Sequence, residues 1–595
     1  MRIEDYALIG DLHTAALVSR DGSIDWFCAP RFDSPACFCA LLGSPENGRW
    51  RIAPAGPASV ERRYREDSLV LETTFRTTGG TVTVIDCMPV RPESGNQTGI
   101  VRVIRGETGS VSMLMDLAIR FDYGKTVPWV KHRRGGLTAL SGPSALELRT
   151  PVQVRGENFH TLAEFTVSAG QSVPFLLEHH SSTERLERER DPLTLVEETT
   201  RWWQDWSKAC AYQGAWRDAV LRSLITLKAL NHRPTGGIVA APTTSLPELI
   251  GGQRNWDYRY CWLRDATFTL YALLVSGLTD EARAWREWLL RAAAGKPSQL
   301  QTVYGVAGER LLPEVRLDWL AGYEDSRPVR IGNLAHRQLQ LDVYGEILDV
   351  FHVSRRSGLQ ETEDAWAFQR ALLDFLEGDW RKLDNGIWEL RGRKRHLTHS
   401  RVMAWVALDR GVKAIEQFGL PGPLEKWKRL RQTIHDEVCR QGFDPDKNSF
   451  VRDYGSSELD ASLLLIPLVG FLPATDPRVL GTVQAVEKEL GHNGFLRRYS
   501  PDRSFDGLEG SEGAFLPCTF WLADNYALVG RLQDASDLFE RLLSIRNDVG
   551  LLAEEYDPVA KRQLGNFPQA FTHVSLVNTA HNLTTVGPAA HRSQV

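Results

Sequence analysis

The sequence predicts a two-domain protein, in which an N-terminal antiparallel β-sandwich is followed by an (α/α)6 toroid. The chain has 595 residues, well beyond the roughly 250–300 at which a single hydrophobic core stops growing. Closely spaced β-rich runs fill its first third without intervening helices, and helical periodicity fills the remainder. We therefore place a β-sandwich domain at 1–190, a connecting helical linker at 191–214 and the (α/α)6 domain at 215–595.

The β-rich runs are separated by turn residues. Asp21-Gly22 stands between apolar runs at 17–18 and 24–26, and Gly79-Gly80 stands between runs at 68–76 and 81–86. Glycine and aspartate at such bends are typical of antiparallel hairpins. Further β-rich runs follow at 100–104, 111–119, 161–167 and 173–177.

Helical periodicity begins near residue 191. A connecting helix is expected at 193–211, and apolar residues then recur at i, i+3 and i+4 in about twelve segments. These segments are 215–232, 266–277, 280–294, 334–355, 362–379, 398–418, 423–441, 459–470, 476–490, 514–529, 533–546 and 568–582. Twelve helices fit six antiparallel pairs, whose loops gather around a central pocket. The long loops 233–265 and 295–333 are candidates for function, because loops of such length are usually functional.

Composition and charge exclude several classes of protein. The net charge of -5 is mild, and the chain lacks a basic tract long enough to bind a phosphate backbone, so nucleic acid is not an expected partner. The sequence lacks a run of 18 apolar residues, and its start lacks the basic and apolar regions of a secretion signal. We therefore expect a cytoplasmic protein without membrane contact, whose oligomeric state is left open.

The eight cysteines do not form a metal-binding pattern. Cys37-Phe-Cys39 lacks the spacing of a metal-ligand pair, and Cys/His clusters of the zinc type are missing from the sequence. Buried free thiols in a reducing compartment are the simplest interpretation. We expect neither a metal ion nor an organic cofactor.

The first candidate for chemistry is Trp388-Glu389, which follows a polar turn. An acid placed against an apolar wall is disfavoured in its ionised form, so its carboxyl can stay protonated near neutral pH and donate to a leaving-group oxygen. The alternative is structural: Trp388 is a core aromatic and Glu389 pairs with Arg391 or Arg393 at the surface.

Two loops are candidates for binding a polyhydroxylated ligand. The segment 255–265 interleaves aromatic side chains with charged ones and ends in Trp262-Leu-Arg264-Asp265. Polar groups beside a stacking ring reject molecules that lack hydroxyls, because the polar groups of the site would then be left without hydrogen-bond partners. Alternatively, Asp265 caps the next helix and pairs with Arg264. In the second loop the candidates are Tyr323, Arg327 and Arg330, with surface arginines around a turn as the alternative.

A third stretch, Gly550-Leu-Leu-Ala-Glu554-Glu555, carries two adjacent carboxylates between helical segments. A carboxylate is a suitable base for activating water, and either glutamate could serve. A solvated acidic face is the commoner meaning of such a run. The acidic loop with Glu509 and Glu512 is a further candidate, with favourable placement at a helix start as its alternative.

Together these stretches resemble glycoside hydrolase family 15, the glucoamylase-like enzymes, over essentially the whole chain. The opening Ile3-Glu-Asp-Tyr-Ala-Leu-Ile-Gly-Asp is similar to that of bacterial members, and Trp262-Leu-Arg264-Asp265 is similar to the family's sugar clamp. Trp388-Glu389 matches the general acid position. Gly550-Leu-Leu-Ala-Glu554 matches the general base loop, with Ala553 where the family commonly has proline, and favours Glu554 over Glu555 as the base.

The resemblance implies an inverting, exo-acting α-glucoside hydrolase. Glu389 would protonate the glycosidic oxygen, Glu554 would deprotonate a water, and the remaining candidates would bind substrate: Trp262, Arg264, Asp265, Tyr323, Arg327, Arg330, Trp388 and Glu555. Similarity to trehalose-hydrolysing bacterial members favours α,α-trehalose as the substrate. The alternatives are a glucoamylase-type or isomaltose-type exo-glucosidase, an α-glucoside phosphorylase that binds anions at Arg327, Arg330 and 394–396, and a non-catalytic sugar-binding protein.

Overall fold

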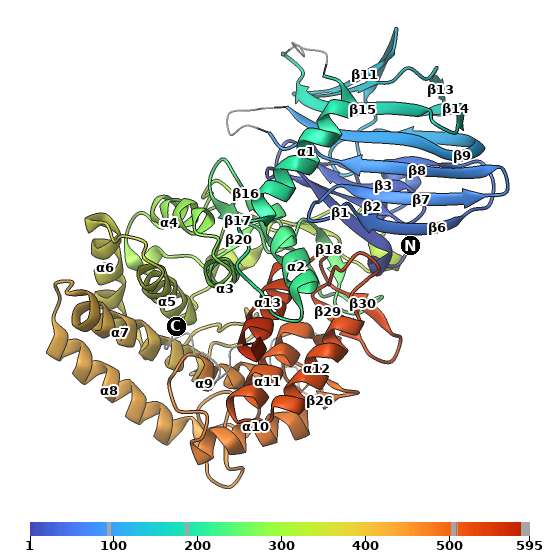
Figure 1. Cartoon of the computed structure of the whole chain (residues 1–595). Coiled ribbons are helices and arrows are strands. Elements are labelled where there is room, and N and C mark those ends of the chain that lie inside the picture. Colours follow the sequence, from blue (N-terminus) through green and yellow to red (C-terminus); the bar gives the residue numbers. More distant parts are fainter. Residues whose placement is uncertain (92–96, 185–189, 501–506, 509, 585–595) are drawn as a thin grey trace.

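The computed structural model describes residues 1–91, 97–184, 190–500, 507–508 and 510–584. Figure 1 shows a β-rich N-terminal part resting on a larger helical part, with the helix α1 (Pro192–Ser207) running between them. This arrangement confirms the predicted fold class. The domain boundaries at 190 and 214 stay a prediction.

The N-terminal part consists of antiparallel strands in two layers that share the long strand β9. The first half of β9 pairs with β8 and β15, and its second half pairs with β5 and β14. The strand therefore crosses from one layer of the sandwich to the other. The strands are β1 (Tyr6–Gly10), β2 (Ala15–Ser19), β3 (Ser23–Cys28), β4 (Ala36–Phe38), β5 (Arg49–Pro54), β6 (Ser59–Tyr64), β7 (Leu71–Thr77), β8 (Gly80–Cys87), β9 (Thr98–Ala118), β10 (Trp129–Arg133), β11 (Gly136–Ser141), β12 (Ser144–Arg149), β13 (Arg155–Glu157), β14 (His160–Ser168) and β15 (Ser172–Ser181).

The predicted hairpins are present, with one correction. β2 pairs with β3 around Asp21-Gly22, and β7 pairs with β8 around Gly79. The runs at 100–104 and 111–119, which we expected to be separate strands, are parts of β9. The register between β8 and β9 skips residue 107, so a β-bulge carries the strand through the polar stretch between the two runs.

The helices that follow α1 form a closed ring (Figure 1). They are α2 (Arg217–Ala229), α3 (Leu263–Val275), α4 (Asp280–Ala292), α5 (Asp342–Arg356), α6 (Glu363–Asp379), α7 (Thr398–Phe418), α8 (Leu424–Gln441), α9 (Leu465–Leu468), α10 (Pro477–Leu490), α11 (Leu516–Leu528), α12 (Leu532–Ser544) and α13 (Ala570–Thr584). Inside the ring, α3 packs against α5 and α13, α5 against α7, and α11 against α13, with α9 between α7 and α11. These contacts close an inner circle of six helices.

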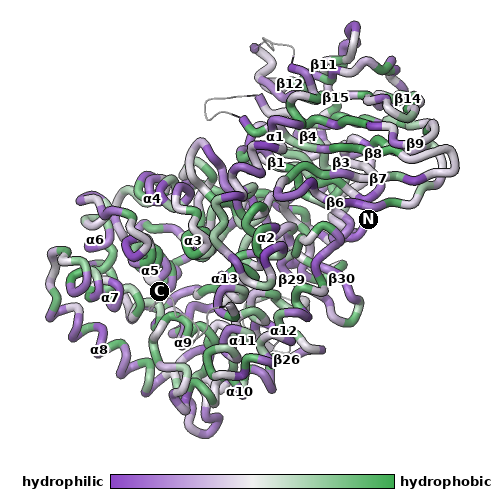
Figure 2. Tube along the Cα trace, in the orientation of Figure 1, coloured by the Kyte–Doolittle hydropathy of each residue, from purple (hydrophilic) through white to green (hydrophobic). Residues whose placement is uncertain are grey.

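Inner and outer helices differ in how much of their surface is apolar. The inner helix α11 is buried at every residue, whereas α8 buries only Trp427, Ile434 and Val438. Figure 2 shows hydrophilic and hydrophobic residues alternating along α8. An outer helix needs one apolar stripe, and an inner helix is covered on all sides. The number of apolar faces on a helix thus distinguishes the inner helices from the outer ones.

Three helix boundaries differ from the prediction in a way that matters for the site. The segment 334–355 begins as a short 3-10 turn and becomes helical only at Asp342, because the backbone is extended at Gln338, where the turn ends. The segment 459–470 is a 3-10 turn followed by the single turn α9. Helix α3 begins at Leu263, so Arg264 and Asp265 lie in its first turn.

Short β-hairpins and one small three-stranded sheet occupy loops between the helices of the ring. They are β16 (Asn231–His232) with β17 (Gly237–Ile238), β18 (Thr244–Pro247) with β19 (Asn255–Asp257), β20 (Cys261–Trp262) with β21 (Val303–Tyr304), β22 (Val315–Arg316) with β23 (Arg330–Ile331), β24 (Phe443–Asp444) with β25 (Ser449–Phe450), β26 (Gly491–His492) with β27 (Phe495–Leu496), and β28 (Ala514–Phe515), β29 (Glu555–Asp557) and β30 (Arg562–Leu564) in one small sheet.

The two parts of the molecule share one continuous hydrophobic core. At their junction the indole of the buried Trp26 donates a hydrogen bond of 2.8 Å to the carbonyl of Pro242. None of the helices in the described ranges has the length and apolar character needed to cross a membrane.

Candidate active site

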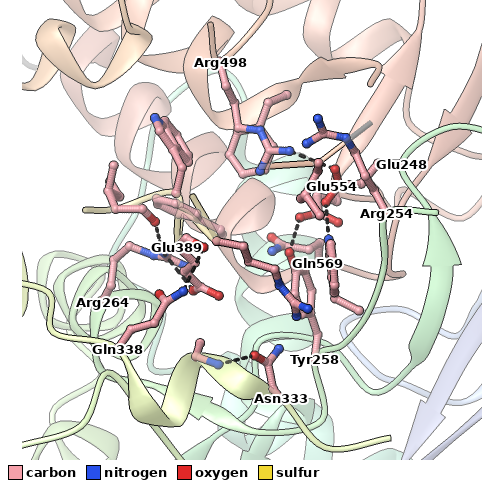
Figure 3. A pocket seen from close by; sticks show the side chains of 18 of the residues that line it. Glu248, Arg254, Tyr258, Arg264, Asn333, Gln338, Glu389, Arg498, Glu554 and Gln569 are labelled. Atoms are coloured by element: carbon pink, nitrogen blue, oxygen red, sulfur yellow. Dashed lines mark hydrogen bonds and ion pairs between the residues drawn. The ribbon is translucent and has the colours of Figure 1, made fainter. Parts of the chain in front are cut away.

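A cavity opens at the end of the helical ring where loops from distant parts of the chain meet. Figure 3 shows Glu389 with Arg264 and Gln338 on one side of it, and Glu554 with Glu248 and Arg498 on the other. The lining residues are Glu248, Arg254, Trp256, Tyr258, Arg264, Asn333, Ala335, Gln338, Ile387, Trp388, Glu389, Arg391, Arg498, Tyr499, Leu508, Phe515, Glu554, Gln569 and Phe571. Two carboxylates far apart in the sequence therefore face one cavity.

Within the described residues, the carboxylate of Glu389 has one hydrogen-bond donor. The indole of Trp262, at the start of α3, donates to its Oε1 at 2.5 Å, and the Arg264 guanidinium lies 3.7 Å from the same oxygen. Burial raises the pKa of Glu389, and the positive charge of Arg264 opposes this rise only in part. The environment favours a protonated carboxyl, as the sequence predicts for an acid beside tryptophan.

The backbone of Glu389 is strained in a way that fixes this carboxyl. Its φ is +60°, in the left-handed region that side chains other than glycine rarely adopt. The amide of Gln338 donates to the Glu389 carbonyl at 2.9 Å, and the amide of Asn385 donates to the Leu390 carbonyl at 2.7 Å. These bonds hold the turn after Trp388 in place. Our structural alternative paired Glu389 with Arg391 or Arg393, but in the described residues Glu389 lies near Arg264 and Arg391 pairs with Glu314.

Glu554 is 1% exposed and is oriented by a phenol. The hydroxyl of Tyr258 donates to its Oε1 at 2.7 Å, while its Oε2 has no hydrogen-bond partner in the described part of the chain. Burial and the like charge of Glu248 raise the pKa of Glu554, and Arg498 and the Tyr258 hydroxyl act in the opposite direction. The backbone amide of Asn566 also favours the ionised form, and Oε2 is the oxygen left to accept a proton.

The neighbouring Glu555 does not line the cavity. It belongs to β29, where side chains alternate, and its Oε2 accepts from the amide of Gly513 at 2.7 Å. Glu555 groups with Glu248 and Glu512, whose oxygens lie within 4.8 Å of one another, as ligands of a cation would. The Arg498 guanidinium bonds to Glu248 at 2.9 Å and to Glu512, and it supplies the positive charge that this group requires. Glu555 therefore does not face the cavity, contrary to the substrate-binding role expected from the sequence.

Among the other predicted binding residues, Arg264 and Trp388 reach the cavity. Arg264 donates to Asp265 at 2.6 Å and to the Ile387 carbonyl at 2.5 Å, so Asp265 acts on the cavity through Arg264. Asp265 does pair with Arg264, as the alternative interpretation states, but the N-cap of α3 is Trp262. Trp388 donates to both oxygens of Asp460 at 2.9 Å. Trp262 contacts Glu389 from outside the lining.

The second predicted loop does not reach the cavity. Tyr323 donates to the carbonyl of Met1 at 2.9 Å, which directs its ring to the N-terminal part, and Arg327 is exposed at the surface. Arg330 bonds to the carbonyls of Gln253 and Asn255 and lies 4.7 Å from the ring centroid of Trp256, where it supports a lining residue from behind. Loop position alone therefore misplaced these three side chains.

Two further predicted segments are the basic stretch 394–396 and the acidic loop with Glu509 and Glu512. Arg395 pairs with Asp453, and Nδ1 of His396 accepts a hydrogen bond from Arg401, so two of the three side chains proposed to bind anions are engaged elsewhere. Glu512 pairs with Arg498, whereas Glu509 lies outside the described residues.

Several lining residues escaped the sequence-based prediction. Tyr258 stood in the aromatic run at 255–265, and that position was the available indication of its role. Arg498 joins Glu248 and Glu512 and stacks 4.9 Å from the ring centroid of Phe515. Gln338 and Gln569 lie in or beside segments predicted as ordinary helix starts. Their importance comes from contacts with residues remote in the chain, and the local sequence pattern does not predict such contacts.

The fold of the chain is similar to that of solved carbohydrate-active enzymes. A crystal structure of a bacterial glucoamylase complexed with acarbose superposes with a TM-score of 0.73 at 13% identity, over 98% of this chain and 94% of that one. A structure described as a putative kojibiose phosphorylase from human microbiome gives 0.53 at 9% identity, over 97% and 86%. At these identities the likeness shows the fold alone.

Sequence comparison assigns the family. A trehalase of Mycobacterium tuberculosis is 38% identical over 97% of this chain and 88% of its own length, and one of Mycolicibacterium smegmatis is 36% identical over 100% and 93%. Residues 1–203 match the family model of the trehalase-like N-terminal domain, and residues 214–581 match that of glycosyl hydrolases family 15. The chain therefore belongs to glycosyl hydrolases family 15 and is a glycoside hydrolase.

Proposed function

We propose that this enzyme hydrolyses α,α-trehalose to two glucose molecules with inversion at the attacked carbon. The observation that carries the mechanism is the placement of Glu389 and Glu554 on opposite sides of one cavity, each with a hydrogen bond from an aromatic side chain. Relatives named trehalase, aligned over nearly the whole chain, support the choice of substrate.

In the proposed mechanism Glu389 is the general acid. Its raised pKa keeps a proton on the carboxyl, and that proton passes to the glycosidic oxygen as the bond to the anomeric carbon breaks. Trp262 accounts for Oε1, so the proton is carried by the opposite oxygen. The leaving glucose then departs as a neutral alcohol.

Glu554 is the proposed general base. Tyr258 fixes Oε1, and the unbonded Oε2 accepts a proton from a water that attacks the anomeric carbon from the face opposite the leaving group. Inverting glycosidases keep their two carboxyls about 6.5–9.5 Å apart to leave room for this water. No bond between enzyme and sugar forms, and the attacked carbon changes configuration.

We further propose that the two sugar rings occupy different depths of the cavity. Arg264, Ile387 and Phe571 are buried lining residues and would hold the attacked glucose. Arg391 is exposed and lies 4.1 Å from the ring centroid of Trp256, so this pair would receive the departing glucose at the mouth. The exposed guanidinium of Arg391 can donate hydrogen bonds to the hydroxyls of this sugar.

A substrate panel tests the proposal. Purified enzyme is incubated with trehalose, maltose and isomaltose, with and without inorganic phosphate, and the products are quantified as glucose and glucose 1-phosphate. We expect trehalose to yield glucose whether or not phosphate is present, without formation of glucose 1-phosphate. Turnover of maltose or isomaltose alone would replace the substrate with that of a glucoamylase-type enzyme, and glucose 1-phosphate would establish a phosphorylase.

The acid limb of the pH profile is expected to respond to Glu248. Since the Glu248 carboxylate raises the pKa of Glu554, and the base must be ionised, the wild-type rate should fall on the acid side nearer to neutrality than for an ordinary glutamate. Glu248→Gln removes the like charge, so the acid limb of kcat/KM should move to lower pH by roughly one unit. Glu281→Gln, a buried glutamate paired with Lys228 away from the cavity, is the control and should leave the limb unmoved. If the acid limb of Glu248→Gln stays in place or moves to higher pH, this electrostatic account is contradicted.

We also propose a cytoplasmic location. All eight cysteines are free thiols, and seven are buried, as is usual where the surroundings are reducing.

A further inference from the structure

The segment that carries Tyr258 has two chemically different faces. Trp256 and Tyr258 line the cavity, whereas Asp257 and Arg259, which alternate with them along the chain, are fully buried on the other side, towards the β-sandwich. This alternation follows from the extended backbone of β19 and the residues after it. The proposed catalytic mechanism uses only the first face.

The Arg259 side chain uses all five of its N–H donors on that second face. Nε donates to Asp257 at 2.9 Å, and one terminal nitrogen donates to Asp257 at 2.7 Å and to the Tyr123 hydroxyl at 3.0 Å. The other terminal nitrogen donates to the Ser34 carbonyl at 2.9 Å and to the Cys28 sulfur at 3.4 Å. Three of the four partners belong to the N-terminal β-domain.

Asp257 extends the same contact set to a second segment that lines the cavity. Besides Arg259, its Oδ2 accepts from the amide of Gly332 at 3.1 Å, and its carbonyl accepts from the side chain of Asn333 at 3.4 Å. Asn333 lines the cavity. The buried pair therefore connects the β-domain to two separate cavity segments.

We propose that Arg259 is a positioning residue, through which the β-domain holds Tyr258 in hydrogen-bonding contact with Glu554. This inference rests on the proposed role of Glu554 as the base. A guanidinium with every donor bonded in a planar arrangement leaves the segment 257–259 little freedom to shift. A displacement of about 1 Å in a catalytic contact can cost roughly a hundredfold in rate. The β-domain thus contributes to catalysis without lining the cavity.

The test uses the full-length enzyme and the pH dependence of kcat/KM. In Asp257→Asn/Arg259→Met, which removes both charges of the buried pair, we expect kcat/KM to fall by roughly tenfold to a hundredfold. The hydrogen bond from Tyr258 favours the ionised form of Glu554, so its loss should move the acid limb to higher pH. Tyr258→Phe should produce the same shift, and combining it with Asp257→Asn/Arg259→Met should add no further shift.

A matched control separates positioning from stability. Arg102 and Asp86 form an equally buried pair within the β-sandwich, and Arg102 also donates to the carbonyls of Trp50 and Gly22. Asp86→Asn/Arg102→Met should lower the melting temperature and leave the acid limb unmoved. Tyr123→Phe, which deletes one contact of Arg259, should shift the limb in the same direction by less, and it decides the question if the Arg259 variant does not fold.

Two results would overturn the proposal. One is an acid limb that stays in place when the Arg259 contacts are removed, and the other is a shift that adds fully to that of Tyr258→Phe. Failure of the proposed function is recognised separately, because Glu554→Gln would then keep the wild-type rate on whichever α-glucoside the enzyme hydrolyses.

Discussion

Replacing Glu389 by glutamine is expected to reduce kcat on trehalose by roughly 10²–10⁴-fold, the usual contribution of one general acid–base group. Glutamine keeps the size of the side chain and can still accept the Trp262 bond, but its amide has no acidic proton to transfer to the glycosidic oxygen. KM should change little, because the contacts that hold the sugar remain. Steady-state kinetics at several pH values measures both quantities.

A substrate with a better leaving group provides the control for this variant. Fluoride departs from α-glucosyl fluoride with much less need for a proton than a sugar alcohol, so Glu389→Gln should retain a far larger fraction of the wild-type rate on the fluoride than on trehalose. Equal losses on both substrates would show that Glu389 is required for something other than proton donation.

Replacing Glu554 by glutamine is expected to cause a loss of similar size, roughly 10²–10⁴-fold in kcat. The amide can still accept the Tyr258 hydroxyl bond, but it cannot take a proton from the attacking water. Since water must attack whichever group leaves, the loss should be comparable on trehalose and on α-glucosyl fluoride. The pair of glutamine variants is therefore distinguished by the second substrate.

The adjacent glutamate is the matched control for Glu554. Glu555→Gln changes a carboxylate of equal burial one residue away, and its amide can still accept from Gly513. Because Glu555 does not line the cavity, we expect this variant to stay within about tenfold of the wild-type rate. If Glu555→Gln is the inactive variant and Glu554→Gln is active, the assignment of the base is reversed.

The fold was predictable from sequence because its periodicities are regular. The alternation in the first third gave the hairpin β2–β3 around Asp21-Gly22, and the helical periodicity separated twelve segments that correspond to α2 through α13. The prediction was wrong where a strand or helix contains an irregularity in its backbone. The bulge at residue 107 joins two expected strands, and the extended stretch before Asp342 divides an expected helix.

The site was predictable where side chain and local sequence act together, as at Trp388-Glu389 and Arg264-Asp265. It was not predictable where function depends on partners from remote segments. Tyr258 contacts Glu554 across 296 positions, and Arg498 reaches Glu248 across 250. Conversely, Tyr323 and Arg327 have suitable chemistry in a long loop, but the loop directs them to the N-terminus and to the surface.

The measurement that tests the central claim most directly is a time-resolved proton NMR spectrum of fresh trehalose hydrolysis, recorded before the anomers equilibrate. An inverting enzyme with Glu389 as acid and Glu554 as base releases one β-glucose from the attacked ring and one α-glucose as the leaving group. We predict equal initial amounts of the two anomers. Release of α-glucose alone would mean retention, and it would contradict the roles assigned here to the two carboxylates.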